Sequence, residues 1–314
     1  MDSEVRTVTI VGAGAVGGAV AAMLHDAGEE VSLLGSGERR HRLEREGLVV
    51  NRKSYRLPVV NPEEPANPAD IVIVAVKHHH LEGAIGDMAH VVGPETIIMS
   101  LMNGVESEER LGRTYGDDVV LPATIVGIDA LREGNRITYS KRGKIFFGAA
   151  DGRETARVGW VRALFDRAGI AYEIPADMRR TIWWKFMINV GVNQVSAALR
   201  APYGVFQAPG EARLVMEAAM REVTALAGKL TIPLTEADIA GWYPILEGLS
   251  PEGKTSMLQD VEAGRKTEVE MLAGKVIELG GRLGVPTPVN ERLFMVIRKI
   301  EESYSEERDP VRPL

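Results

Sequence analysis

The chain has 314 residues, 45% of them hydrophobic, which is enough for one large domain or two ordinary ones and argues against extended disorder. Its net charge of −7 disfavours a nucleic-acid partner, because binding to a phosphate backbone requires a basic surface. It contains no cysteine, which excludes disulfides, thiolate nucleophiles and cysteine metal sites.

The N-terminal segment MDSEVRTVTI is acidic and leads directly into a strand pattern. No run of about 18 apolar residues occurs in the sequence. We therefore expect neither a signal peptide nor a membrane span, and we expect a cytoplasmic location.

The first local pattern predicts a complete βαβ unit. A β-rich run over Val5–Val11 is followed by Gly12, Gly14 and Gly17 in G-x-G-x-x-G spacing, an Ala-rich helix, and a second strand over Glu30–Leu34. Gly12 permits a tight turn, Gly14 lets the backbone approach a pyrophosphate, and Gly17 lets helix and strand pack closely. Because the motif stands between a strand and a helix, it favours a dinucleotide-binding turn over a merely tight turn.

The end of the second predicted strand indicates which dinucleotide binds. NAD sites usually place a carboxylate there for the ribose hydroxyls, whereas NADP sites supply cations for the 2′-phosphate. No carboxylate stands at Gly35 or Ser36, and Arg39 and Arg40 follow closely. This pattern favours NADP(H). The alternative is that these arginines, with Glu38 among them, form the solvated first turn of the next helix.

Two more strands are predicted over Asp70–Lys77 and Glu95–Gly104, both apolar runs of the kind buried in parallel sheets. Lys77 and Asn103 stand at the carboxyl ends of these runs, which is the edge where open parallel sheets bind ligands. Both are therefore candidate site residues. Three histidines follow Lys77, but adjacent histidines cannot all face one ion from a regular element, so no metal site is predicted.

Beyond Asn103, β-rich runs alternate with turns such as Glu133-Gly134-Asn135, which we interpret as antiparallel strands that finish the sheet. One helix and a short strand then precede Pro175, where the predicted domain boundary lies. The sequence thus predicts an α/β Rossmann-type dinucleotide-binding domain over 1–174. An all-α domain for substrate binding and catalysis is predicted over 175–314, where Gly and Pro separate long amphipathic stretches.

The segment TIWWKFMINVGVNQVSA, residues 181–197, is typical of a buried helix that carries a polar stripe. At 100° per residue, Lys185, Asn189 and Asn193 follow one another at i, i+4 and i+8 on one face. A buried ammonium is costly without a partner, so the stripe is predicted to face a ligand. The alternative is that these groups meet water or cap a neighbouring helix.

Two later segments complete the pattern. The stretch PEGKTSMLQDVEAGRKTEVEMLAGKVIELGGRLG predicts one helix entered near Ser256, whose hydroxyl is either an N-cap or a ligand contact. The last residues, 303–314, are charged and contain proline, and we expect a loosely held tail there.

Five ordered motifs resemble those of the ketopantoate reductases, or 2-dehydropantoate 2-reductases, of pantothenate and coenzyme A biosynthesis. They are VGAGAVG, AVK ending at Lys77, MNG around Asn103, WWKFMINVGVN and SMLQDVEAGRKTE, and they span nearly the whole chain. The resemblance implies a Rossmann-type domain followed by an all-α domain of the 6-phosphogluconate dehydrogenase C-terminal-like type. It also implies that NADPH reduces ketopantoate to D-pantoate.

Carried over residue by residue, the resemblance makes Lys185 the general acid that protonates the substrate. The implied substrate contacts are Asn103, Lys185, Asn189, Asn193 and Ser256. With the two arginines predicted above, the expected cofactor contacts are Gly12, Ala13, Gly14, Ala15, Val16, Gly17, Arg39, Arg40, Lys77, Asn103, Ala130 and Glu268.

Two positions depart from the family's pattern. Ser36 stands where many members carry an arginine for the 2′-phosphate, and Tyr203 where some carry a substrate-binding asparagine. The alternatives are a reductase of another 2-oxo acid, a related dehydrogenase of a 3-hydroxy acid, sugar acid or glycerol phosphate, and a non-catalytic NADP(H)-binding sensor. A small 2-oxo acid is the expected partner, nucleic acid and membrane are not, and a homodimer stays open.

Overall fold

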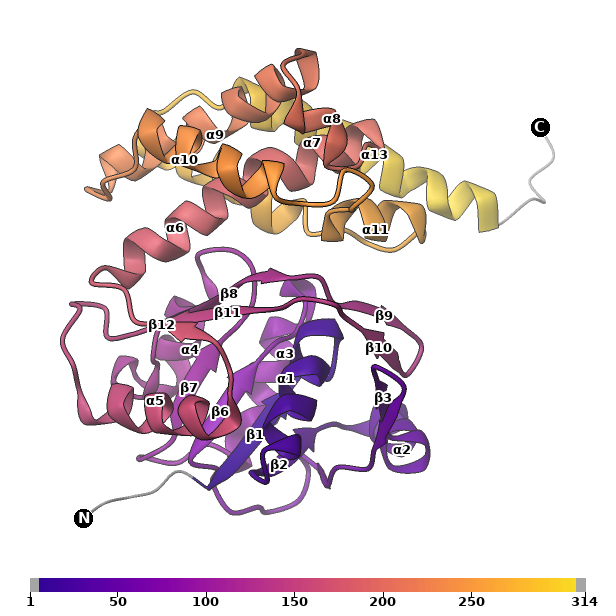
Figure 1. Ribbon diagram of the computed structural model, residues 1–314, viewed down its shortest axis with the longest axis vertical. Helices are drawn as coiled ribbons and strands as arrows, with labels where there is room; N and C mark the ends of the chain where they lie inside the picture. The colour runs from indigo at the N-terminus through magenta and orange to yellow at the C-terminus, as the bar shows by residue number, and fades with distance from the viewer. Residues whose placement is uncertain (1–5, 309–314) are drawn as a thin grey trace. The chain divides into compact units, whose positions relative to one another are not determined.

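The computed structural model describes residues 6–308, and the chain divides into two compact units, 1–181 and 182–314 (Figure 1). The division falls inside helix α6 (Met178–Ile188), whereas the sequence placed the boundary at Pro175, ahead of that helix. The first unit contains a parallel sheet with helices, and the described part of the second contains helices only. The predicted fold class is therefore confirmed.

A five-stranded parallel sheet with the order β5-β2-β1-β6-β7 forms the centre of the first unit. Its strands are β1 (Thr7–Val11), β2 (Glu30–Leu34), β5 (Val59–Val60), β6 (Ile71–Val74) and β7 (Ile97–Ser100). The chain runs outward from β1 to β5 on one side and from β6 to β7 on the other. The order thus reverses between β1 and β6, the switch point where doubly wound sheets bind ligands.

Side chains along these strands alternate between two hydrophobic clusters, one on each face of the sheet. Val8 and Ile10 pack with α1 and α5, whereas Val11 packs with α3 and α4. Successive strand residues point to opposite faces, so a sheet covered on both sides needs continuous apolar runs. The helices of this unit are α1 (Ala15–Asp26), α2 (Gly37–Glu46), α3 (Leu81–Asp87), α4 (Ser107–Tyr115) and α5 (Ala156–Ala168).

The strands beyond Asn103 do not finish the parallel sheet, so that prediction was wrong. β8 (Ala123–Ile128) pairs antiparallel with β11 (Arg142–Phe147), which also pairs with β12 (Tyr172–Glu173) in a separate three-stranded sheet. An isolated bridge between Ile98 and Val120 connects β7 with the segment before β8. The antiparallel character was predicted correctly, but the partner strands were not.

The predicted turn at Gly134 is confirmed, and it closes the hairpin of β9 (Leu131–Glu133) and β10 (Arg136–Thr138). Gly134 has a φ of 61°, which glycine adopts without steric cost. The hairpin pairs with β3 (Leu48–Val50) and β4 (Lys53–Tyr55) in a four-stranded sheet. This sheet brings the hairpin next to α1, where a Cβ at Gly18 would lie 2.2 Å from the Ile137 side chain.

The second unit is built from helices, two of which contain a π-helical turn. Its elements after α6 are η4 (Asn189–Asn193), α7 (Gln194–Leu199), α8 (Gly204–Gln207), α9 (Glu211–Lys229), α10 (Glu236–Glu247), α11 (Ser256–Glu262), η5 (Glu270–Gly274), α12 (Lys275–Leu283) and α13 (Pro288–Arg308). Across the described residues, no helix is both long and apolar enough to cross a membrane.

The single helix predicted from Ser256 to the glycines before Val285 is instead broken into two parts. α11 ends at Glu262, and the chain turns at Gly264, whose φ is 57°. The turn is stabilised by Arg265, whose backbone N–H donates to the Asp260 carbonyl at 2.8 Å and whose Nε donates to the Asp260 carboxylate at 2.9 Å. The residues around Gly264 are mostly good helix formers, such as Glu262, Ala263 and Lys266, so the sequence pattern did not reveal the break.

The expected loose tail is helical as far as Arg308, so this prediction was wrong for its first part; residues 309–314 lie outside the described residues. Tyr304 connects α13 with α11, because its hydroxyl donates to the Val261 carbonyl at 3.4 Å. This contact gives the charged last turns of the helix a packing partner that their composition did not reveal.

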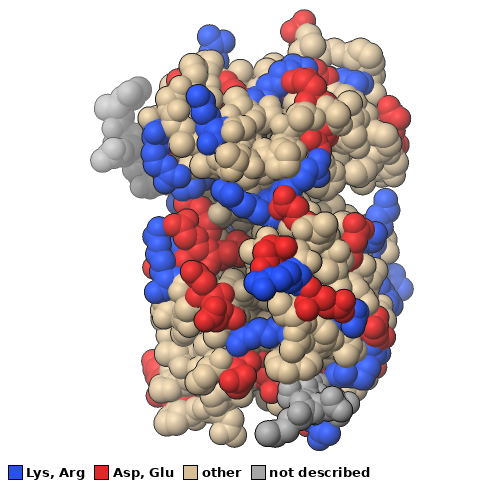
Figure 2. Space-filling model, turned by 90° about the vertical axis from the view of Figure 1, so that its left-hand side faces the viewer, with Lys and Arg blue, Asp and Glu red and all other residues tan. Residues whose placement is uncertain are grey.

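Surface charges of both signs are interspersed on the face presented in Figure 2. Elsewhere in the described part of the chain, exposed charges form local ion pairs, such as Lys254 with Glu262 at 2.8 Å and Lys144 with Glu173 at 3.2 Å. Exposed pairs of this kind contribute little to stability. Because many cations lie beside carboxylates in this way, a cluster of cations is informative.

Candidate functional site

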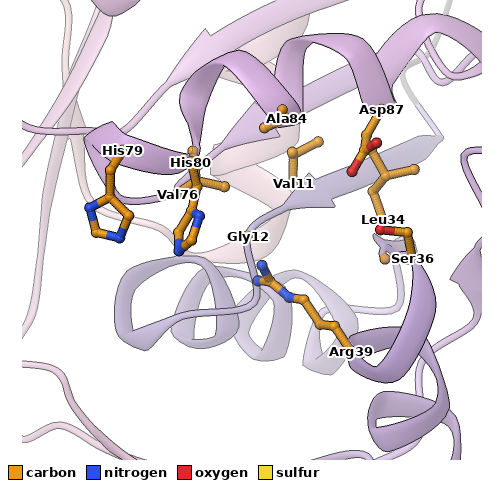
Figure 3. Close-up of a pocket in the computed structure, with 12 residues that line it drawn as sticks. Val11, Gly12, Leu34, Ser36, Arg39, Val76, His79, His80, Ala84 and Asp87 are labelled. Atoms are coloured by element: carbon orange, nitrogen blue, oxygen red, sulfur yellow. The ribbon is translucent and has the colours of Figure 1, made fainter.

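A cavity of about 220 Å³ opens at the carboxyl ends of β1, β2 and β6, beside the switch point of the sheet. Figure 3 shows the Arg39 side chain extending from α2 toward the turn at Gly12, with Asp87 on the α3 side. The residues that line this cavity are Val11, Gly12, Leu34, Gly35, Ser36, Arg39, Val76, His79, His80, Gly83, Ala84 and Asp87. They include the turn and the strand end that the sequence assigned to the cofactor.

The glycine turn has the geometry that its predicted role requires. Gly12 has a φ of 104°, and a Cβ there would lie 2.6 Å from the Ala75 carbonyl oxygen. A Cβ at Gly17 would lie 2.1 Å from the Gly12 carbonyl oxygen, so no larger residue fits without backbone movement. At Gly14, by contrast, a Cβ would meet only the Ala75 oxygen, at an ordinary 3.8 Å. The tight turn thus follows from Gly12 and Gly17, while Gly14 faces open space.

The N-terminus of α1 fits a phosphate group. Gly14, the N-cap residue, provides no side-chain cap, and the first turn contains no acidic residue. Gly14, Ala15 and Val16 are partly exposed, whereas Gly12, Ala13 and Gly17 are buried. Uncapped backbone N–H groups and the helix dipole together favour an anion at such an end. These residues would hold the pyrophosphate of a bound dinucleotide.

Arg39, Arg42 and Arg132 lie close enough together to repel one another, and a role for Arg132 was not predicted. Arg132, on β9, donates from Nη1 to the Ala13 carbonyl at 2.6 Å and from Nε to the Gly134 carbonyl at 2.8 Å. Burial, followed by repulsion from Arg39 and Arg42, lowers the pKa of Arg132. Burial and repulsion from Arg42 also lower the pKa of Arg39, while Asp87 acts in the opposite direction. An anion bound among them would relieve this repulsion.

Arg40 differs from Arg39, although the sequence treated the two alike. Its Nε donates to Glu44 at 2.8 Å and its Nη1 to Glu64 at 3.2 Å, and these two hydrogen bonds raise the pKa of its guanidinium. Arg40 does not line the cavity. It therefore stabilises α2 and the segment after β5, and the cofactor role predicted for it gains no support from this geometry.

Lys77 and Asn103 follow two neighbouring strands at the carboxyl edge of the sheet. Val74 of β6 pairs in register with Ser100 of β7, and each candidate lies three residues beyond one member of this pair. Both are partly buried. Ala130, the predicted backbone contact, lies between β8 and β9, two residues from Arg132. The first unit thus holds every predicted cofactor residue except Glu268.

The histidines after Lys77 form a short 3₁₀ turn, η1 (His78–His80), in which the rings of His79 and His80 lie 4.2 Å apart. Within residues 6–308, no group of three or more histidine, aspartate or glutamate side chains is arranged to hold a metal ion.

Lys185, Asn189 and Asn193 are buried in the helical unit, with exposed fractions of 9%, 9% and 7%. Lys185 lies on α6, whereas Asn189 and Asn193 begin and end the π turn η4. In an α-helix each i+4 step advances by about 40° around the axis. A π turn contains more residues, so it reverses part of this drift. The three side chains therefore align more closely than the predicted regular helix allows.

Ser256 and Glu268 border the same part of the helical unit. α11, which begins at Ser256, packs against η4 and α7, and η5, which follows Glu268, also contacts η4. The N-cap of α11 is Thr255, whose Oγ1 accepts from the Leu258 N–H at 3.1 Å, and Ser256 is exposed. The capping interpretation of Ser256 was therefore wrong, and the ligand interpretation stays open.

Tyr203 packs against the loop that leads into α11. Its backbone N–H donates to the Gly253 carbonyl at 2.9 Å, and a Cβ at Gly253 would lie 3.1 Å from its ring. Burial raises the pKa of Tyr203 to about 12, so its hydroxyl is neutral at physiological pH. A neutral aromatic side chain thus lies beside Gly253, in the loop before Ser256.

Two family models match the chain in the order of its two units. The model described as Ketopantoate reductase PanE/ApbA matches residues 8–152, and Ketopantoate reductase PanE/ApbA C terminal matches residues 177–301. This chain belongs to the ketopantoate reductase family. The resemblance inferred from the five motifs is confirmed.

Individual relatives agree over almost their full length. A 2-dehydropantoate 2-reductase from Archaeoglobus fulgidus is 31% identical over 302 residues, which are 95% of this chain and 99% of the relative. The crystal structure of a PanE/ApbA family ketopantoate reductase from Ralstonia eutropha JMP134 has a TM-score of 0.82 at 26% identity, and the match covers 95% of this chain and 99% of that one.

A different activity occurs on the same fold. The ternary structure of D-mandelate dehydrogenase with NADH and anilino(oxo)acetate has a TM-score of 0.87 at 23% identity, and the match covers 95% of this chain and 99% of that one. At this identity the likeness concerns the fold alone. Family membership therefore establishes an oxidoreductase of the ketopantoate reductase family, and leaves the substrate and the choice of nucleotide to the site residues.

The distinct roles of Thr255 and Ser256 can be tested by stability. Thr255→Ala should lower the free energy of unfolding by about 1 kcal/mol, because α11 loses its side-chain cap. Ser256→Ala should stay within about 0.5 kcal/mol of the wild type, as for other exposed positions. Urea unfolding followed by circular dichroism measures both. An equal loss in the two variants would show that Ser256 has a structural role after all.

Proposed function

We propose that this protein uses NADPH to reduce 2-dehydropantoate, or ketopantoate, to D-pantoate, with Lys185 as the proton donor. The observation that carries the proposal is the buried Lys185 on α6, followed by two buried amides in a π turn, within a member of the ketopantoate reductase family. The name of the Archaeoglobus fulgidus relative supports the same activity.

The chemistry of ketone reduction matches this residue set. When bound, NADPH supplies the hydride that the 2-oxo carbon accepts. Negative charge then develops on the carbonyl oxygen, which requires a positioned proton donor and further hydrogen-bond donors. The Lys185 ammonium is both a cation and a donor of three protons. It transfers one proton to that oxygen, the product is an alcohol, and solvent reprotonates the amine.

The remaining candidates suit the other groups of the substrate. A carboxylate and a hydroxyl need neutral donors and an acceptor, because additional cations would compete with Lys185 for the carboxylate. Asn189, Asn193 and the exposed Ser256 hydroxyl provide the donors, and the Glu268 carboxylate provides the acceptor. In the first unit, Lys77 and Asn103 would contact the cofactor, and Asn103 would also contact the substrate.

A second candidate is the reduction of a different 2-oxo acid on the same scaffold. It is favoured by the neutral aromatic Tyr203 beside the loop before Ser256, where an asparagine would have offered hydrogen bonds to a hydroxyl. An apolar or aryl side chain on the substrate would suit such a wall better than the hydroxyl of ketopantoate. The D-mandelate dehydrogenase fold likeness is consistent with this candidate.

A panel of 2-oxo acids separates the two candidates. With NADPH absorbance as the signal, ketopantoate should give the highest kcat/KM, and phenylglyoxylate, pyruvate and 2-oxoisovalerate should give lower values. The change in kcat/KM from wild type to Tyr203→Asn, measured with each acid, shows how strongly Tyr203 determines the choice of substrate. Background rates with ketopantoate alongside clear turnover of another acid would contradict the assignment, and background rates with every acid would favour the non-catalytic sensor.

The arginine cluster predicts the cofactor preference. Arg39→Ala and Arg132→Ala should each reduce the NADPH to NADH ratio of kcat/KM by roughly thirtyfold, since charge-assisted contacts to a phosphate contribute on the order of 2 kcal/mol. Arg40→Ala is the matched control and should leave the ratio within about twofold, because its partners are Glu44 and Glu64. If the NADPH to NADH ratio of all three variants equalled that of the wild type, the cluster would not bind the 2′-phosphate.

The role of Lys185 predicts a defect in kcat. Lys185→Ala should lower kcat by roughly 100-fold or more while the Kd for NADPH stays nearly unchanged, because the loss falls on the transition state. Lys229→Ala, at the exposed end of α9, is the control for loss of a lysine in the same unit. Steady-state kinetics, NADPH titration and circular dichroism distinguish the outcomes. Near-native kcat, or a defect that consists only of unfolding, would refute the proton-donor role.

A further inference from the structure

Gln194 follows directly after the π turn η4, and its side chain is completely buried. Its Nε2 donates to the Val190 carbonyl at 2.8 Å and to Asn290 Oδ1 at 3.0 Å. The first contact spans i to i−4 inside the helix, at the place where the wider turn changes the backbone hydrogen-bond ladder. The second contact leaves the helix and reaches α13. Gln194 therefore connects the π turn with a distant part of the chain.

The connection continues from Asn290 to α9. Asn290 Nδ2 donates to Glu222 Oε2 at 2.7 Å and to the Ala219 carbonyl at 3.4 Å. Glu222 also accepts from the backbone N–H groups of Val289 at 2.8 Å and Asn290 at 3.0 Å, which lie in the first turn of α13. A carboxylate at a helix N-terminus is stabilised by the helix dipole. The hydrogen-bond network thus ends at the Glu222 carboxylate, which is charged and accepts from two backbone N–H groups.

The direction of each hydrogen bond in this network is determined by the groups at the two ends of the network, which can only accept protons. The Glu222 carboxylate and the Ala219 and Val190 carbonyls can only accept protons. The Asn290 amide must therefore turn its NH₂ group toward α9 and its oxygen toward Gln194, and Gln194 must turn its NH₂ group toward η4. One arrangement gives partners to both NH₂ groups and to the Asn290 oxygen, so the network specifies a single position for the Gln194 side chain.

Close packing against α9 reinforces the same position. Gly191, in the middle of η4, lies so close to α9 that a Cβ would come within 2.6 Å of the Met220 side chain. η4 thus lies against α9 while Gln194, through Asn290, is attached to α9 and α13. The π turn is held both by close packing and by directed hydrogen bonds.

A purely apolar role does not explain Gln194. Its Oε1 is buried and has no hydrogen-bond partner, an arrangement that costs free energy which an apolar side chain of similar size would avoid. The amide therefore has a role only if the hydrogen bonds of its Nε2, which fix the geometry of the π turn, outweigh the free energy lost at its oxygen. The residues on either end of the turn are Asn189 and Asn193, both of which belong to the candidate substrate site.

We infer that Gln194 is a positioning residue: with Asn290 and Glu222 it holds the η4 π turn so that Asn189 and Asn193 present their amides alongside Lys185. This inference rests on the proposed function for the identity of the site. It assigns no contact between Gln194 and the substrate. Its consequence is that the substrate-binding geometry depends on a network on the far side of the turn.

The test uses Gln194→Met in the full-length protein, because methionine keeps the length of the side chain and removes both N–H groups. With whichever 2-oxo acid the wild type turns over fastest, KM should rise about tenfold, because the two hydrogen bonds that Nε2 donates are lost. The kcat value should change much less, and the Kd for NADPH should stay the same. Leu246→Ala, a buried truncation on α10, is the control for general destabilisation of the helical unit and should leave KM unchanged.

Coupling to the asparagines separates positioning from simple packing. In an Asn189→Ala/Asn193→Ala background, Gln194→Met should change KM by less than about twofold, because groups that act through one another are not additive. Hydrogen exchange of the peptide that contains residues 189–193 provides a readout that needs no turnover. It should become several-fold faster in Gln194→Met and not in Leu246→Ala.

The outcomes distinguish this inference from the proposed function. If the wild type reduces no 2-oxo acid, the proposed function fails, and the exchange measurement still decides whether Gln194 holds the turn. If the wild type is active but Gln194→Met keeps a native KM or native exchange at 189–193, the inference is overturned and the function stands. Additive effects in the asparagine background would also overturn it, because they would assign Gln194 a structural role only.

Discussion

The first unit depends on how closely the backbone of α1 approaches the ends of β1 and β6. No side chain fits between Gly17 and the Gly12 carbonyl, or between Gly12 and Ala75. This close approach aims the N-terminus of α1 at the switch point of the sheet. The cavity lined by Gly12 lies beside this helix start, which has been brought to the sheet edge without a side chain in between, and Arg132 contacts the same turn through the Ala13 carbonyl.

The second unit meets a different constraint, which is the burial of polar groups. Lys185, Asn189 and Asn193 lie among apolar side chains, where each needs partners to offset its lost hydration. The two π turns, η4 and η5, contact each other at this place, and Glu268 lies two residues before η5. Irregular helix geometry is thus concentrated where the polar residues are, as is often the case at functional sites.

Much of the fold could be predicted because its signals are local. Glu30–Leu34 was predicted to the residue, and the runs around β6 and β7 contain the observed strands, since buried parallel strands are continuous in sequence. The pairing of β9 and β10 with β3 could not be predicted in the same way, because it joins short strands that are far apart in the sequence. The break at Gly264 could not be predicted because good helix formers, such as Ala263 and Lys266, stand on both sides of it.

Prediction of the candidate site from the sequence was limited in the same way. Asn189 and Asn193 were found because a polar residue in an apolar helix is conspicuous, but the 3.6-residue period assumes an α-helix and cannot reveal a π turn. Arg132 was missed because 119 positions separate it from Ala13, the residue whose carbonyl it contacts. Arg39 and Arg40 are adjacent in sequence and alike in chemistry, and only the carboxylates around Arg40 distinguish them.

The π turn also bears on which length changes the gene for this protein can tolerate. A π turn differs from an α turn by a single inserted residue. Five residues of a π turn sweep about the same angle around the axis as four residues of an α-helix, so deleting one residue within 189–193 would restore a regular helix and leave the later residues nearly in place. Gln194 would keep its direction toward Asn290. The change would fall on the turn itself, because Asn189 and Asn193 would then stand three positions apart and no longer on one line. A deletion here is therefore expected to keep the helix and lose the alignment of the two amides.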